Sequence, residues 1–165
     1  MKKFFIITVL AIASFSSSNA QVTWNIRVGG GIESYGYQTG GRYNFIDETN
    51  EGAFALALES NIPFKRGKAF CFSPSVIGVI GGESQEFIFP LLVGYKLKLS
   101  QNSLLIPKVG LSVGGGFGDV TFGVVGPSVA LSFEHKHFIM GFNGCFINVV
   151  DEGGSSYLFT LGYKF

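Results

Sequence analysis

The sequence has 165 residues and a formal net charge of +1, from 12 Lys and Arg against 11 Asp and Glu. This length suits a single domain, and the even charge balance excludes the strongly basic surface of a nucleic-acid-binding protein. The 24 Gly and 18 Phe, beside 14% charged residues, are too apolar for an ordinary water-exposed surface and too rich in glycine for helices. We therefore expect a medium other than water, such as a lipid bilayer, to cover much of the surface.

Residues 1–20 are predicted to form a secretory signal peptide. Lys2 and Lys3 precede an apolar run at residues 4–13, and a polar stretch ends at Ala20, which is the charged, apolar and small-residue order of such signals. Cleavage is expected after Ala20, which leaves residues 21–165 as one mature domain. The apolar run is about ten residues, short of the ~20 that a helical span needs, so a membrane anchor is the weaker alternative.

Apolar residues at alternate positions predict strands along the rest of the chain. In chain order, the expected strands cover residues 23–33, 52–63, 69–81, 85–99, 104–115, 120–134, 137–150 and 156–165. Within 85–99, every odd position from Phe87 to Leu99 is apolar or aromatic, whereas the even positions become small and charged toward Lys96 and Lys98. One face suits lipid and the other a lumen, so we expect an all-β, eight-stranded antiparallel transmembrane β-barrel.

Two features complicate these strands. Prolines at positions 63, 74, 90, 107 and 127 fall in or near strands, and a closed barrel has no free edge where a missing N–H is harmless. Bulges or unpaired rungs are expected beside them. The strand at 120–134 has apolar residues on both faces, so its register stays open.

The connections between the expected strands sort by charge. One set, assigned to the outside of the cell, has Arg42 as its single basic residue beside Asp47, Glu48, Glu51, Glu83, Glu86, Asp119, Asp151 and Glu152. The other set, assigned to the periplasm, holds Lys65, Arg66, Lys68, His135, Lys136 and His137. Charge sign is independent of apolar alternation, so the separation supports the alternating connections.

Three stretches carry a family resemblance. They are Phe87-Ile88-Phe89-Pro90-Leu91-Leu92-Val93-Gly94-Tyr95-Lys96, Lys108-Val109-Gly110-Leu111 and Leu161-Gly162-Tyr163-Lys164-Phe165. They resemble the small outer-membrane barrel domains of Bacteroidetes, the broad PorT-like and OmpX-like group. The closing pattern is similar to the signal that the barrel-assembly machinery recognises, which implies an insertion role for Phe159, Leu161, Tyr163 and Phe165. The resemblance implies a location and a fold but no activity.

Inward positions are predicted to hold a lumen charge network. Its candidate members are Arg27, Glu33, Glu59, Lys96, Lys98, Lys108 and Lys164. An eight-stranded barrel is only wide enough for side chains to fill it, and buried charges must pair. Arg27 and Glu59 lie at similar height on neighbouring strands and form the best candidate pair. We expect a plugged interior, with a narrow or gated ion path as the alternative.

The connection at 34–51 is the longest on the outer side. It contains Tyr35, Tyr37, Arg42, Tyr43 and Phe45, and aromatic-rich loops favour contact with a partner. A recognition surface for an unidentified ligand and a mobile cap over the barrel mouth both fit this composition.

His135 and His137 form at most half of a metal site, and a solvated turn is favoured because no third ligand accompanies them. Cys71 and Cys145 are expected to be free, buried thiols rather than a disulfide. Both point inward from walls about four strands apart, at ~4.8 Å per strand, beyond the ~7 Å Cα limit for a disulfide. The glycine runs at 29–31 and 114–118 fit strand kinks and a loop, because neither opens a helix as a phosphate loop does.

The leading hypothesis is a structural or binding protein of the outer membrane without catalysis or cofactor. Its expected partners are outer-membrane lipid and, during insertion, the assembly machinery. Alternatives are a small channel, a component of a secretion system, and a soluble lipocalin-type barrel with its apolar face inward. A membrane enzyme acting on lipid A would need His with Ser, Asp or Glu at the outer rim, whereas both histidines are expected at the other end.

Overall fold

The computed structural model describes residues 22–37, 49–64, 69–81, 84–116, 122–148 and 152–165. The expected signal peptide and its cleavage site after Ala20 lie outside this part of the chain. So do Arg42, Tyr43 and Phe45 of the expected recognition loop.

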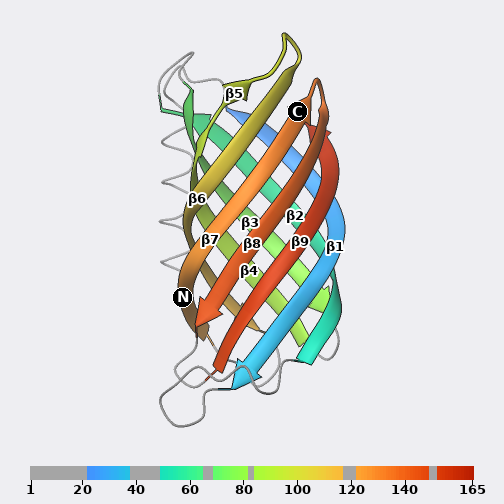
Figure 1. Cartoon of the computed structure of the whole chain (residues 1–165), viewed down its shortest axis with the longest axis vertical. Coiled ribbons are helices and arrows are strands. Elements are labelled where there is room, and N and C mark those ends of the chain that lie inside the picture. Colours follow the sequence, from blue (N-terminus) through green and yellow to red (C-terminus); the bar gives the residue numbers. More distant parts are fainter. Residues whose placement is uncertain (1–21, 38–48, 65–68, 82–83, 117–121, 149–151) are drawn as a thin grey trace, which may run out of the picture.

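The described residues form one closed antiparallel sheet (Figure 1). Its strands are β1 (Thr23–Tyr37), β2 (Thr49–Pro63), β3 (Phe70–Gly81), β4 (Ser84–Tyr95), β5 (Leu97–Lys98), β6 (Ser103–Gly116), β7 (Phe122–His135), β8 (Phe138–Asn148) and β9 (Glu152–Lys164). β4 and β5 both pair with β6 and continue one another, so the wall has eight strands. The predicted eight-stranded antiparallel barrel is therefore confirmed.

The barrel closes where β1 pairs with β9. The register runs from Asn25 opposite Lys164 to Tyr37 opposite Glu152, and the Phe165 N–H donates to the Trp24 carbonyl oxygen at 2.8 Å. The strands approach closely here, since a methyl group at Gly29 would overlap the Phe159 carbonyl oxygen. Glycine at this seam thus lets the strands coil tightly enough to close the barrel.

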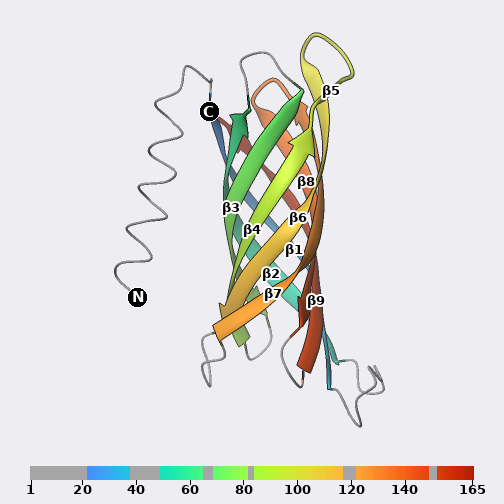
Figure 2. The ribbon, with the colours of Figure 1, turned by 90° about the vertical axis from the view of Figure 1, so that its left-hand side faces the viewer.

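We call the two ends of the barrel the terminus end and the far end. Thr23 and Phe165 lie at the terminus end, which is uppermost in Figures 1 and 2, and the hairpin between β5 and β6 projects from it. The far end is the opposite one, where β1 and β8 end. A two-residue turn, Lys136-His137, joins β7 to β8 at the terminus end, and Lys136 has a left-handed φ of 53°.

Several strands extend farther than predicted at the far end. β1 continues to Tyr37 and β2 begins at Thr49, so Tyr35 and Tyr37 are strand residues and not part of a loop. The reason is continued pairing on both sides of β1: Tyr35 lies opposite Thr49 on β2, and Tyr37 lies opposite Glu152 on β9. The expected 34–51 connection is thereby shortened to residues 38–48.

The prolines leave the register of the wall unchanged. Rungs are unpaired beside Pro74 and Pro90, but the register is the same on either side of each gap. The one described register shift lies between Gly114 and Gly115 on β6, away from every proline. The predicted unpaired rungs are therefore confirmed at Pro74 and Pro90, where the strands accommodate the missing N–H by leaving a rung open, whereas the predicted bulges are wrong.

The outer surface of the wall is apolar. Large side chains such as Leu56, Phe89, Leu111 and Phe159 are 43–54% exposed on it. Aromatic side chains gather at the terminus end, where Phe70 contacts Tyr95 edge to face and Tyr163 contacts Phe165, with centroids 4.9 and 5.1 Å apart. Among the described residues, no helix is both long and apolar enough to cross a membrane.

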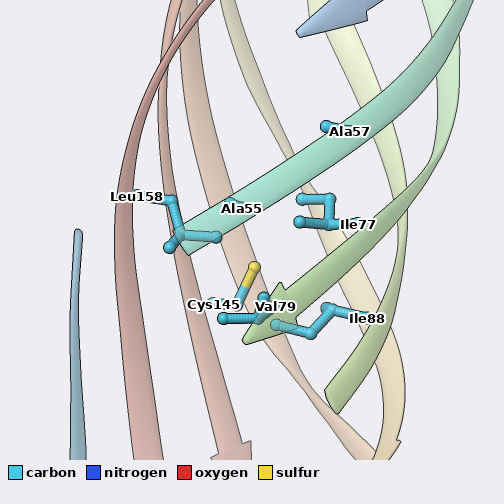
Figure 3. Packing of buried hydrophobic residues seen from close by; sticks show 7 residues of the cluster. All are labelled: Ala55, Ala57, Ile77, Val79, Ile88, Cys145 and Leu158. Atoms are coloured by element: carbon cyan, nitrogen blue, oxygen red, sulfur yellow. The ribbon is translucent and has the colours of Figure 1, made fainter. Parts of the chain in front are cut away.

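The interior contains one apolar cluster near the level of Gly29 and Gly31. It packs the buried side chains of Ala55, Ala57, Ile77, Val79, Ile88, Cys145 and Leu158 (Figure 3). The cluster lies beside these glycines, because Ala55 pairs with Gly29 and Leu158 pairs with Gly31 on neighbouring strands. The cluster has a polar edge, because the buried Ser112 hydroxyl donates to Cys145 Sγ at 3.7 Å.

Candidate functional site in the barrel interior

A buried ion-pair network occupies the interior on the terminus side of the apolar cluster. Glu59 accepts from Arg27 Nη2 at 2.7 Å through one carboxylate oxygen and from Lys108 Nζ at 2.6 Å through the other. The three side chains come from β2, β1 and β6, and each is at most 3% exposed. Two cations on one carboxylate leave this cluster with one positive charge in excess.

Strand register brings the candidate pair Arg27 and Glu59 together. Arg27 lies opposite Ala57, and Glu59 is two residues farther along β2, so the pair is diagonal across neighbouring strands. Long side chains on one face reach such diagonal neighbours. The pair thus follows from the alternation on β1 and β2.

Polar neighbours complete the coordination of Glu59. Asn25 Nδ2 and Asn61 Nδ2 donate to Glu59 Oε1 at 3.3 and 3.2 Å. Ser73 Oγ in turn donates to Asn61 Oδ1 at 2.6 Å. A carboxylate with this many donors is held in place in a closed interior, and removal of it leaves several groups unpaired.

Glycines on the neighbouring strands make room for Arg27. A methyl group on Gly162 of β9 would lie 2.6 Å from Arg27 Cγ, and one on Gly141 of β8 would overlap Arg27 Nη1. The side chain therefore crosses β9 and reaches the inner face of β8. Only glycine, which has no side chain, leaves enough space for the Arg27 side chain at these two positions.

A second ion pair lies closer to the terminus end. Lys164 Nζ on β9 binds Glu134 Oε2 on β7 at 2.6 Å. The strand expected at 120–134 ends at Glu134, which was not among the predicted lumen charges. The alternation of residues could have predicted that Glu134 faces inward. Glu134 follows Ser128, Ala130 and Ser132 at every second position of β7, and all three are buried.

Two lysines of the expected network are placed differently. Lys98 is exposed on β5, so its assignment to the lumen is wrong, and Lys96 is half-buried in the gap between β4 and β5. β3 pairs with β4 only as far as Tyr95, after which the Lys96 N–H donates to the Ala69 carbonyl oxygen at 2.7 Å. The alternation that faces residues inward therefore stops at Tyr95.

Glu33 faces inward on the far side of the apolar cluster. It is 1% exposed and accepts from Ser156 Oγ at 3.2 Å. It is six residues from Arg27 along β1, which corresponds to about 20 Å at ~3.3 Å per residue. Glu33 thus belongs to a separate polar level near the far end.

The two histidines form hydrogen bonds at exposed sites, and the two cysteines are buried in the barrel. His135 Nδ1 shares a hydrogen bond with Ser103 Oγ at 2.9 Å, and His137 Nδ1 lies 3.1 Å from the Lys164 carbonyl oxygen. Cys71 and Cys145 are free and buried. In the described part of the chain, no group of three His, Cys, Asp or Glu side chains is placed to hold a metal ion.

Comparisons with known proteins bear on the fold. Neither a family model nor a curated protein sequence matches the chain. Among solved structures, Neisserial surface protein A matches with a TM-score of 0.57 and 8% identity, over 86% of this chain and 97% of its own. Ail, the attachment invasion locus protein of Yersinia pestis, matches with a TM-score of 0.51 and 14% identity, over 87% and 99%. The chain therefore has the fold of small outer-membrane β-barrels.

Proposed function

We propose that the chain is an integral outer-membrane protein that acts through structure or binding and catalyses no reaction. Residues 1–20 serve as its signal peptide, with cleavage after Ala20, and its barrel resembles the PorT-like and OmpX-like group of Bacteroidetes. The observation that carries the proposal is the facing of the wall: apolar side chains such as Phe89 and Leu111 point outward, whereas Arg27, Glu59 and Lys108 are buried. A lipocalin-type barrel needs the reverse facing.

Fractionation tests this location. We expect the protein to sediment with outer membranes, to require detergent for extraction, and to migrate differently on a gel before and after boiling. A protein that remains in the aqueous fraction without detergent would contradict the proposal, because its outer face would then have to be covered by something other than lipid.

The interior is proposed to be plugged. The apolar cluster, with Ile77, Ile88 and Leu158 fully buried, lies between the Arg27 level and the Glu33 level. An ion crossing it would lose its hydration and gain few polar ligands, such as the Ser112 hydroxyl that donates to Cys145. The rival is a small channel, which the polar side chains on either side of the cluster favour.

Single-channel recording separates the plug from the channel. We expect purified barrel to leave a planar bilayer silent at voltages where a known porin conducts. Steps of current that change size in Ala57→Ser, a variant that adds a hydroxyl to the apolar cluster, would establish a conducting path through it. The folded fraction of each sample, read from the unboiled gel band, serves as the control.

Residues 34–51 are proposed as the binding segment on the cell surface. Ail was solved in complex with the heparin analogue sucrose octasulfate. A polyanion would meet Asp47, Glu48 and Glu51 beside a single Arg42 in this chain, so we propose a ligand that is not polyanionic. Outer-membrane lipid is proposed to contact the outer face of the barrel wall, between this segment and the terminus end.

Trypsin on intact cells tests the orientation, since Arg42 is the only Lys or Arg between residues 28 and 64. We expect cleavage after Arg42 in intact cells, with Arg42→Gln as the resistant control. Cleavage that instead requires lysed cells, or that occurs at Lys65–Lys68 in intact cells, would reverse the assigned orientation.

A further inference from the structure

Several buried polar atoms converge on one place of the inner wall. In the part of the chain that the structure describes, Arg27 Nε and Nη1, Ser132 Oγ and Asn143 Nδ2 are buried without a hydrogen-bond partner. Ser132 pairs with Gly141 across β7 and β8, and Asn143 lies two residues farther along β8. Arg27 arrives at the same place, because its Nη1 is the atom nearest to a methyl group built on Gly141.

These atoms share one chemical property, which is that each can donate a hydrogen bond. The guanidinium nitrogens of Arg27 and the amide nitrogen of Asn143 only donate, and the Ser132 hydroxyl can rotate to do so. Leaving a buried donor without an acceptor destabilises the folded state, and more so when the donor is charged. A group that accepts several hydrogen bonds at once therefore suits this place.

The local charge favours an anion as that acceptor. Glu59 binds both Arg27 and Lys108, which leaves one positive charge in excess. Glu134 is engaged with Lys164, and Glu33 lies beyond the apolar cluster. Six residues of strand span ~20 Å, and over that distance, at an effective dielectric constant of ~20, an opposite charge attracts this cluster only weakly. Glu33 therefore does not offset the excess charge.

We propose that a small monovalent anion of halide size binds inside the barrel beside Gly141. Arg27 and Ser132 donate to it, with Asn143 as a further donor, and it balances the second cation on Glu59. The anion is a structural component of the interior. Anion binding at this site requires neither the residues at 34–51 nor a conducting barrel.

Bromide is the probe for this site. The whole chain is refolded into detergent in sodium bromide and crystallised, and anomalous scattering is recorded at the bromine absorption edge. We expect a peak within hydrogen-bond distance of Arg27 and Ser132. An ordered water at that place without anomalous signal would overturn the proposal.

Two variants identify the ligands in solution. Ser132→Ala removes a proposed donor, whereas Ser75→Ala removes another buried, unpartnered hydroxyl that lies on β3, opposite Glu59 in the register. We expect the urea midpoint of the parent to be higher in bromide than in gluconate at equal ionic strength, because gluconate is too large for the interior. Ser75→Ala should keep this difference and Ser132→Ala should lose most of it. Equal midpoints in the two salts for the parent, or an unchanged difference in Ser132→Ala, would contradict the assignment.

Discussion

Glu59 is the residue on which the buried charges depend. It holds Arg27 and Lys108 at 2.7 and 2.6 Å in a region closed to solvent. A buried ion pair adds little net stability over an apolar replacement, but loss of one partner leaves an uncompensated charge. Two cations would be left in this case, so the carboxylate matters more than either cation alone.

The substitution Glu59→Gln tests this dependence. It keeps the size of the side chain, and we expect a loss of about 3–5 kcal/mol in the free energy of unfolding. Urea titration in lipid vesicles, followed by the unboiled gel band, gives the measurement. Glu51→Gln, on the same strand and half-buried, is the matched control and should change stability by less than about 0.5 kcal/mol. Equal losses in the two variants would show that the Glu59 pairs contribute nothing specific.

Glycine at position 141 provides the second test at this scale. A methyl group there would overlap the Arg27 guanidinium, whereas one at Gly144, on the outer face of the same strand, would lie 3.4 Å from Val129 Cγ2. We expect Gly141→Ala to destabilise the barrel by ~1–3 kcal/mol through overpacking. Gly144→Ala should be neutral or slightly stabilising, since the loss of a glycine restricts the unfolded chain. Similar urea midpoints for both variants would mean that the Arg27 side chain adopts another conformation without loss of stability.

The outward and inward faces were predictable because alternation is a local property of the sequence. Phe87 to Leu99 repeats every two residues, and one face of a strand needs no knowledge of its partners. The Lys164–Glu134 pair was not predictable in this way, because it joins β9 to β7 across β8 and depends on two registers at once. The contact of Arg27 with Gly162 and Gly141 was unpredictable for the same reason. It depends on β9 and β8 following β1 in the order of strands around the barrel.

At the scale of elements, β9 closes the barrel and carries the pattern proposed for assembly. Its outward residues Phe159, Leu161 and Tyr163 alternate with inward Thr160 and Gly162. Phe165 follows the strand, and its backbone N–H bonds to Trp24 of β1. The side chain of Phe165 is 66% exposed, so its replacement leaves the interior and this hydrogen bond unchanged.

Phe165→Ala separates assembly from stability. We expect several-fold less heat-modifiable protein in outer membranes of cells that express it, with little change in the urea midpoint of refolded barrel. Phe64→Ala is the control, because Phe64 is 59% exposed at the same end and follows β2. Equal amounts of the two variants in the membrane would remove the assembly role from Phe165.

The break between β4 and β5 shows where prediction at the element scale failed. Apolar alternation continues through Leu97 and Leu99, which predicts one strand from 85 to 99. β3 begins at Phe70 and can pair no farther than Tyr95, so the wall ends there on one side while β5 continues against β6 alone. A strand boundary that is set by the length of the neighbouring strand cannot be predicted from the apolar alternation of the strand itself.

At the scale of the whole molecule, burial is inverted relative to a soluble barrel. The inner wall holds Arg27, Glu59 and Lys108, and the outer wall holds large apolar side chains around the whole ring of strands. A closed barrel satisfies its backbone groups internally, which is the condition for crossing a hydrocarbon layer with strands. The stability of the barrel should then depend on how deep an outward side chain lies in the bilayer.

Arginine substitutions at two depths test the bilayer directly. Val109 is 63% exposed near the middle of β6, and Leu99 is 58% exposed on the hairpin that projects from the terminus end. In lipid vesicles we expect Val109→Arg to cost ~2–4 kcal/mol and Leu99→Arg ~0–1 kcal/mol, because an arginine is most costly at the midplane. Urea titrations of the two variants and the parent give both values. If the outer wall faced water, an arginine at either exposed position would lower the free energy of unfolding by no more than about 0.5 kcal/mol. Two small and equal losses would therefore mean that no bilayer surrounds the wall.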